Sequence, residues 1–363
     1  MVSSLSAAMG EGLTSQPAYM NELLEPIQKK FQLPALAAAM ILEGKLHSAG
    51  AVGIRKTGET NQVTLEDKFH IGSCTKSMTA TLAAMLVEQK KLSWETRVAE
   101  IFPEWTNRMA KPFGNISLAW LLGHKSGIDP ERDNDLIKGR AGAFSGTPEA
   151  QRRAYCEWLV QQPLQSAPGL KFAYNNSGYA LAGAMLERRG GKSWEEQIRR
   201  NIFEPLKMES GGFGPPNSPG KIDQPWGHQW VSGRLKAFSL DNPVTIAPAG
   251  AVHCNIFDLA RYAQFHLEGA RGEGQLLTRE SFRQLGLPFA GEEYAMGWLV
   301  VERSWAGGKA LTHAGSNTLF YSVIWIAPAR NFAVVVATNL GGRNAEEGCD
   351  AVAGALIERW LKK

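Results

Sequence analysis

The sequence predicts a mixed α/β (α+β) chain in which strands from both ends meet in one sheet and helices fill the middle. Strand-like apolar runs occur near the N-terminus at 36–41 and 46–54, and β-branched and aromatic residues return at 320–326 and 332–338. Between these ends, from about 73 to 210, apolar residues recur mainly with helical spacing. Strands that are far apart in sequence are therefore expected to lie together.

The length of 363 residues provides material for two or three domains. We expect an α/β sheet domain built from both termini, residues 1–72 plus 222–363, and a mainly helical domain, residues 73–221. A cleft between two such domains is a common place for an active site, and we expect the site there. The net charge is 39 − 35 = +4, without long basic runs, so nucleic acid is not an expected partner.

The individual elements follow from local patterns. Apolar residues recur with helical spacing at 19–31, and a proline after this stretch ends the predicted helix. Two strands around a glycine turn are expected next. A short alternating stretch at 69–71 precedes a long apolar helix that begins at Ser73. In the last third we expect strands, among them one at 311–312, followed by an amphipathic closing helix at 346–361.

Cysteine and histidine usage excludes several classes of site. The four cysteines form no Cys-x-x-Cys pair, and the seven histidines form no H-x-H or H-E-x-x-H pattern. No metal, cofactor or disulfide scaffold is therefore expected. We expect no transmembrane segment, and residues 1–17 lack the features of a signal peptide. As it stands the sequence is typical of a cytoplasmic protein; the alternative is a periplasmic or secreted protein whose signal peptide has been removed. The oligomeric state stays open.

The pattern S-x-x-K occurs twice. Ser218 and Lys221 are separated by Pro-Gly, so no helical turn aligns them. Ser73 and Lys76 begin the apolar helix, where this spacing places both side chains on one face, about 5–6 Å apart at Cβ. A serine needs a base nearby to act as a nucleophile, and burial at a helix N-terminus favours the neutral form of a lysine. The alternative for this pair alone is a serine N-cap and a solvated lysine.

Ser73-Cys74-Thr75-Lys76 resembles the nucleophile motif of serine β-lactamases and penicillin-binding proteins. Those families continue with Y-x-N and then K-T-G or H-x-G, and this sequence has Tyr174-Asn175-Asn176 and His313-Ala314-Gly315 in that order. The segment 168–176 is similar to that of class C β-lactamases and family VIII carboxylesterases, and H-x-G to the D,D-peptidase and D-aminopeptidase branches. The resemblance spans about 20–360. It implies a β-lactamase/transpeptidase-like fold, with an antiparallel sheet flanked by helices and an inserted all-helical domain.

The resemblance also implies roles for individual residues. Ser73 would be the acylated nucleophile and Lys76 its base or proton relay. Tyr174 would pass the proton to the leaving group and activate the deacylating water. Asn176 would hold Lys76 and the acyl side chain of the substrate. For Tyr174 and Asn176 the alternatives are a buried core tyrosine and a loop asparagine.

The last motif implies a substrate-binding strand. The N–H groups of Ser73 and Ser316 would form the oxyanion hole, and Gly315 would let the substrate backbone approach the strand edge. At His313 class C β-lactamases have a lysine, and a histidine is only partly charged near pH 7, which argues against a specialised β-lactamase. The alternative is a surface histidine on an edge strand. His228, in a segment similar to W-G-Y, would contact substrate or simply be packed.

These features together predict a serine hydrolase that cleaves carboxylic ester or amide bonds in small molecules through an acyl-enzyme. The substrate class is a short-chain ester or a D-amino-acid-type amide, with β-lactam hydrolysis as a side activity. A dedicated class C-like β-lactamase is one alternative. A penicillin-binding sensor or scaffold protein without turnover is another, from a different functional class.

Overall fold

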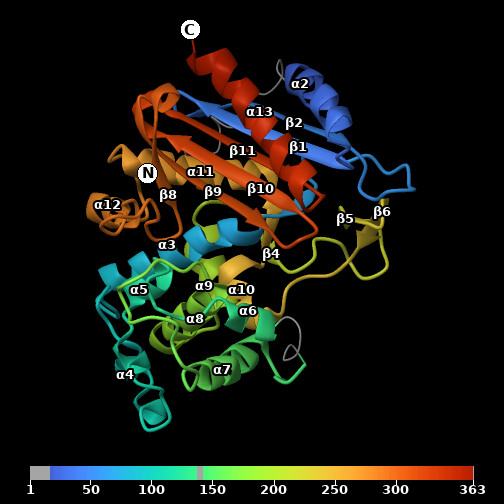
Figure 1. Ribbon diagram of the computed structural model, residues 1–363. Coiled ribbons are helices and arrows are strands. Elements are labelled where there is room, and N and C mark those ends of the chain that lie inside the picture. The colour runs from blue at the N-terminus through green and yellow to red at the C-terminus, as the bar shows by residue number, and fades with distance from the viewer. Residues whose placement is uncertain (1–16, 137–141, 363) are drawn as a thin grey trace.

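The main sheet of the protein joins the two ends of the chain, as the sequence predicts. The computed structural model describes residues 17–136 and 142–362 (Figure 1). Six antiparallel strands lie side by side in the order β2-β1-β11-β10-β9-β8. In that order they span Lys45–Gly53, Ala35–Leu42, Phe332–Thr338, Tyr321–Ala327, Gly308–Ser316 and Leu299–Arg303.

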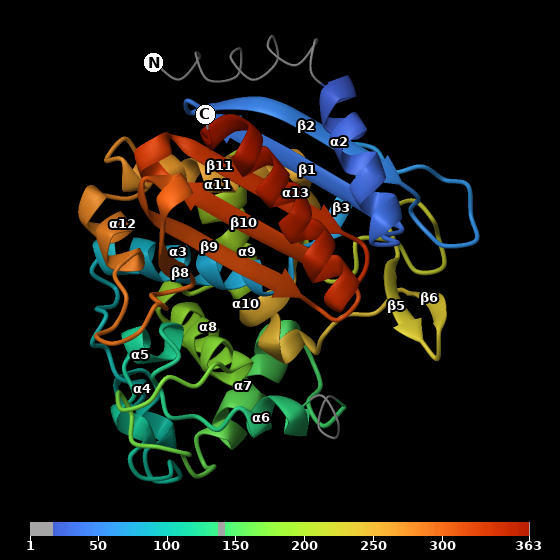
Figure 2. The ribbon, with the colours of Figure 1, turned by 45° about the horizontal axis from the view of Figure 1, so that its top comes forward.

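The central strands are buried on both faces, which explains their continuous apolar sequences. Helices α2 (Pro17–Lys30) and α13 (Arg343–Leu361) cover one face, and α11 (Ile256–Ala270) packs on the other (Figure 2). Along β1, Ala37 belongs to the core on the α11 side, whereas Leu36 belongs to the core beneath α2 and α13. The alternation of strand side chains thus divides one apolar run between two cores.

A helical region lies below the sheet in Figure 1. Its helices are α3 (Thr75–Glu88), α4 (Val98–Ile101), α5 (Leu118–Leu122), α6 (Glu131–Asp135), α7 (Pro148–Leu159), α8 (Asn176–Gly190) and α9 (Trp194–Ile198). A three-stranded sheet in the order β3-β7-β4 spans Lys68–His70, Val252–Asn255 and Gly212–Phe213. Because β4 pairs with β7 and α10 (Ala247–Gly250) packs on α3 and α8, contacts cross the expected boundary at 222, and the division into two domains stays a prediction.

The C-terminal part of the chain contains elements besides the strands and the closing helix that the sequence predicts. It contains the 15-residue helix α11 and the shorter α12 (Arg279–Leu285), together with the hairpin of β5 (Gly227–Val231) and β6 (Arg234–Phe238). The side chain of Asn255 caps α11 by accepting a hydrogen bond from the backbone N–H of Asp258. Among the described helices, none combines the length and apolar character needed to cross a lipid bilayer.

Two glycines allow the sheet to approach the turn that carries Ser73. This turn, η1, is a single 3₁₀ turn at Gly72–Cys74 that leads directly into α3. A Cβ at Gly315 would lie 2.1 Å from the carbonyl oxygen of Ile71 and 2.5 Å from the backbone nitrogen of Ser73. Gly72 has φ +49°, a left-handed conformation that favours glycine. The position of Ser73 against β9 therefore depends on the absence of side chains at both residues.

We predict that Gly315→Ala displaces η1 from β9. The added methyl group meets backbone atoms, which have no rotamer with which to move away, so the free energy of unfolding should fall by about 2 kcal/mol or more. Gly354→Ala is the matched control, because nothing lies within 4 Å of a Cβ there, in the middle of α13. Urea denaturation of both variants checks this, and equal stability of the two would contradict the close approach.

Candidate active site

Ser73 and Lys76 face one another at the start of α3. The Nζ atom of Lys76 lies 3.0 Å from the Oγ atom of Ser73, 2.8 Å from Oδ1 of Asn176 and 2.8 Å from the carbonyl oxygen of Ala249. These partners come from η1, α8 and α10, so three separate segments meet at one amine. The sequence spacing alone predicts only the first of these contacts.

The environment of Lys76 favours the neutral amine. The residue has no solvent-exposed surface, and burial lowers its pKa from 10.5 to about 7. The carboxylate of Asp133 opposes this by raising the pKa, and so, more weakly, does Cys74. Because Asn176 Oδ1 and the Ala249 carbonyl only accept hydrogen bonds, they take the two N–H groups of a neutral amine. The nitrogen lone pair is then left for the hydroxyl proton of Ser73.

Tyr174 completes the group around Ser73. Its ring lies 4.8 Å from Nζ of Lys76, and its hydroxyl interacts with the Ser73 side chain. Although 39% of the residue is exposed, burial raises the pKa of the hydroxyl well above its ordinary value of 10. Tyr174 is therefore protonated at neutral pH, while Lys76 is the group with a free lone pair.

The Asn176 side chain is positioned by the N-terminus of α8. Asn175 caps this helix, with its Oδ1 accepting from the backbone N–H of Gly178 at 2.7 Å. From α6, Asp133 accepts the backbone N–H groups of Asn176 at 2.7 Å and of Ser177 at 2.9 Å. Asp133 thus both fixes the backbone of Asn176 and supplies the negative charge that Lys76 feels. No sequence pattern indicated this residue.

The backbone of β9, which carries Ser316, lies against η1, which carries Ser73. A Cβ on Gly72 would lie 2.3 Å from the backbone nitrogen of Ser316. The Ser316 hydroxyl donates to the carbonyl of Phe320 at 2.7 Å, so its side chain closes the turn after β9. The close approach at Gly315 is to η1 itself; its expected role toward the substrate backbone stays a prediction.

The prediction that His313 is partly charged near pH 7 is wrong. The residue is 4% exposed, and burial together with the nearby Lys76 lowers its pKa to about 3. Its Nδ1 donates to the carbonyl of Ala314 at 2.7 Å, so its Nε2 accepts from the hydroxyl of Tyr294 at 3.0 Å. The imidazole is therefore neutral near pH 7 rather than partly charged, and it is not a surface residue of an edge strand.

The substrate contact considered for His228 has no support in the structure. The side chain is fully buried in β5. Its Nδ1 donates to the carbonyl of Asn339 at 2.8 Å, and its Nε2 accepts from the backbone N–H of Thr57 at 3.0 Å. Both ring nitrogens are thus occupied by the protein, and His228 holds the hairpin against the end of the main sheet, which is the packed alternative.

An aromatic cluster that the motifs do not reveal holds Tyr174. The ring of His124 lies 4.3 Å from that of Tyr174 and 4.7 Å from that of Tyr294. His124 also brackets the segment around Tyr174, because its Nδ1 accepts from the N–H of Asn175 at 3.3 Å and its carbonyl from the N–H of Ala173 at 2.8 Å. The cluster links Tyr174 to His313 on β9 through Tyr294.

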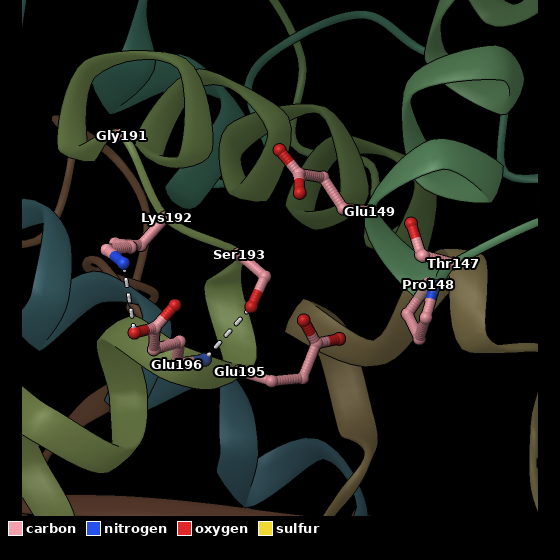
Figure 3. Close-up of a pocket in the computed structure, with 8 residues that line it drawn as sticks. All are labelled: Thr147, Pro148, Glu149, Gly191, Lys192, Ser193, Glu195 and Glu196. Carbon is pink, nitrogen blue, oxygen red and sulfur yellow. Dashed lines mark hydrogen bonds and ion pairs between the residues drawn. The ribbon is translucent and has the colours of Figure 1, made fainter.

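Other chemically interesting groups lie outside this arrangement. All four cysteines are free and buried, and within 17–136 and 142–362 no cluster of His, Cys, Asp or Glu is suited to a metal ion. A pocket at the start of α7 and the α8–α9 loop shares no lining residue with the group around Ser73 (Figure 3). There Glu196 pairs with Lys192 at 3.3 Å, and Glu195 pairs with the buried Arg152. These charges are used within the protein.

Similarity to known proteins extends over most of the chain. The family model described as Beta-lactamase matches residues 20–358. Penicillin-binding protein 4 of Amycolatopsis lactamdurans is 25% identical over 341 residues, covering 89% of this chain and 85% of the relative. A protein of Escherichia coli K12 named Beta-lactamase is 26% identical over 298 residues, covering 79% of this chain and 72% of the relative.

Solved structures show the same fold. The octameric penicillin-binding protein homologue from Pyrococcus abyssi superimposes with a TM-score of 0.77 at 26% identity, covering 95% of this chain and 79% of that one. A D-stereospecific amidohydrolase from Streptomyces superimposes with a TM-score of 0.72 at 18% identity, covering 96% and 99%. The second likeness supports the fold alone.

The pKa of Lys76 sets the pH dependence that we predict for any reaction in which its neutral amine is the base. Since the amine loses its proton near pH 7, kcat/KM for an uncharged substrate should rise with pH through about 7 and level off above it. Asp133→Asn removes the charge that raises this pKa, so the midpoint should move to lower pH. Initial rates from pH 5 to 9 measure both.

Asp135→Asn is the matched control for the pH prediction. Asp135 lies on the same helix, but it pairs with Arg132 and does not act on Lys76. Its profile should coincide with that of the unmodified protein. A midpoint that stays in place in Asp133→Asn, or moves equally in both variants, would contradict the electrostatic account of Lys76.

Proposed function

This chain belongs to the beta-lactamase family, and we propose that it is a serine hydrolase that forms an acyl-enzyme at Ser73 and cleaves carboxylic ester or amide bonds. One observation carries the proposal: the buried Lys76 amine, with a pKa of about 7, lies 3.0 Å from the Ser73 hydroxyl. A serine beside a base that is neutral at working pH is the arrangement that nucleophilic catalysis requires.

The proposed reaction begins with attack of Ser73 Oγ on the substrate carbonyl carbon. The hydroxyl proton passes to the lone pair of Lys76, and the carbonyl oxygen becomes an oxyanion that accepts from the backbone N–H groups of Ser73 and Ser316. As the bond to the leaving group breaks, that group takes a proton through Tyr174, which Lys76 replenishes. Asn176 holds the amine of Lys76 throughout, and its amide is also available to the acyl side chain.

Deacylation uses the same groups in reverse. A water molecule attacks the acyl carbon while Tyr174 and Lys76 take up its proton, and Ser73 leaves with a proton restored to its oxygen. Turnover distinguishes this proposal from the sensor or scaffold alternative, in which the acyl-enzyme would persist or would not form. The contact of Lys76 with both the Ser73 hydroxyl and the Tyr174 ring supports turnover.

The preferred substrates are uncharged short-chain esters or small amides, with β-lactam hydrolysis as a weaker activity. A substrate carboxylate is best bound by a permanent cation, whereas the neutral His313 next to the site offers none. A dedicated β-lactamase is the second candidate, favoured by the similarity to the Escherichia coli protein named Beta-lactamase.

We predict that Ser73→Ala reduces hydrolysis of p-nitrophenyl acetate to background while the protein stays folded. The substitution removes the nucleophile, but Ser73 makes no side-chain cap to α3, so stability changes little. Mass spectrometry after treatment with a fluorophosphonate should place one adduct on Ser73. Ser218→Ala, in the second S-x-x-K segment, is the control and should retain full activity. A fluorophosphonate adduct on Ser218 would contradict the assignment of Ser73 as the nucleophile.

The two candidate substrate classes predict opposite preferences. We expect kcat/KM for p-nitrophenyl acetate to exceed that for nitrocefin by at least about tenfold. A difference of this size between two substrates corresponds to the loss of one favourable contact, here the contact to the carboxylate of nitrocefin. D-Ala p-nitroanilide is the third substrate, for the amide class. A nitrocefin value above that of the ester would favour the dedicated β-lactamase.

A further inference from the structure

A histidine–aspartate pair lies beside the turn that carries Ser73. His70, the last residue of β3, is fully buried, and its Nδ1 accepts from the backbone N–H of Gly72 at 3.1 Å. Because Nδ1 accepts, the ring proton is on Nε2, which donates to Oδ2 of Asp241 at 3.0 Å. A chain of two hydrogen bonds thus runs from the backbone N–H of Gly72, the residue before Ser73, to the carboxylate of Asp241.

The second oxygen of the Asp241 carboxylate binds the turn between β9 and β10. Oδ1 of Asp241 accepts from Nδ2 of Asn317 at 3.1 Å. Asn317 is buried, and its own Oδ1 accepts from the backbone N–H groups of Leu319 at 3.2 Å and Phe320 at 3.0 Å. These bonds close the turn between β9 and β10, directly after Ser316.

The two ends of this bridge carry the two N–H groups that the proposed oxyanion hole requires. Ser73 belongs to η1 and Ser316 to the end of β9. In the sequence, 242 residues lie between them. An oxyanion hole acts only if its donors are held in advance where the oxyanion will form. Asp241 joins the two segments through one carboxylate, since His70 holds η1 and Asn317 holds the strand end.

We propose that Asp241 is a positioning residue that fixes the oxyanion hole by joining η1, through His70, to the β9–β10 turn, through Asn317. This inference rests on the proposed function and adds to it three residues outside the patterns S-x-x-K, Y-x-N and H-x-G. None of them needs to touch the substrate. Their effect should appear in transition-state stabilisation, and thus in kcat, rather than in substrate binding.

A reciprocal exchange of side chains tests the bridge. In Asp241→Asn the amide oxygen still accepts from Nε2 of His70. The amide NH₂ group, however, then faces the NH₂ group of Asn317, so two donors meet. Adding Asn317→Asp restores an acceptor there, and the new carboxylate still accepts from Leu319 and Phe320. The double variant therefore recovers every hydrogen bond of the bridge, with the direction of the central bond reversed.

Steady-state kinetics with p-nitrophenyl acetate are the first readout. In Asp241→Asn we expect kcat to fall by about 10- to 100-fold, with KM changed by less than about threefold, and we expect the double variant to recover kcat to within about fivefold of the unmodified protein. Asp258→Asn is the matched control. Asp258 is also buried and accepts from the backbone N–H of Ser210, but it lies outside the bridge. Its kcat should change by less than about twofold.

Amide hydrogen exchange is the second readout and does not depend on activity. In Asp241→Asn, peptides covering 70–76 and 314–320 should both exchange faster, while those covering β11 should not, and the double variant should regain protection.

The outcomes separate this inference from the proposed function. If the unmodified protein turns over ester and Asp241→Asn keeps its kcat within twofold, if the loss appears only in KM, or if the exchange is not rescued in the double variant, the positioning role is wrong and the hydrolase proposal stands. If the unmodified protein neither turns over ester nor takes up a fluorophosphonate at Ser73, the hydrolase proposal is wrong and the oxyanion-hole role of Asp241 falls with it.

Discussion

The arrangement around Ser73 depends on one buried amine with three hydrogen-bond partners. An unpartnered lysine cation in a protein interior is unstable, so the amine of Lys76 either finds acceptors or gives up its proton. Here both happen, because Asn176 and Ala249 accept from it while burial brings its pKa to about 7. The cost of burying this charge is what makes the lysine available as a base near neutral pH.

That constraint explains why segments far apart in the chain must converge with little freedom. The helix that begins after η1 carries Lys76, α8 brings Asn176 and α10 brings a bare carbonyl group. Each is fixed by its own local device, such as the Asn175 cap of α8. The main sheet contributes through β9, whose backbone reaches η1 only because Gly315 has no side chain. Fold stability and site geometry are therefore determined by the same close approaches.

Much of this is readable from local sequence patterns. The period of the apolar residues predicts the central strands and α3, and the spacing of Ser73 and Lys76 predicts their contact. The order of the three motifs implies the fold. The β5–β6 hairpin and α11 were not predicted, although α11 has a clear amphipathic pattern and an asparagine cap. A short apolar stretch is ambiguous until its partner strand or helix is known.

The parts of the site that the sequence does not reveal are long-range. Asp133 acts on Lys76 from another helix, and Tyr294 occupies the free nitrogen of His313 from a loop before β8. His313 itself illustrates the limit: its type and position were known, but its protonation depends on burial, which only the fold sets. A charge can be assigned to a titratable residue only after its surroundings are known.

The most direct test of the account is the pKa of Lys76 measured on the atom itself. In protein carrying ¹³C at the lysine Cε positions, NMR titration from pH 5 to 11 follows each side chain, and Lys76→Ala identifies the resonance. The account predicts that this one signal titrates near pH 7, well below the reference value of about 10.4 for a free lysine. A Lys76 signal that titrates together with the others would contradict it, because the amine would then be a cation at neutral pH and no base for Ser73.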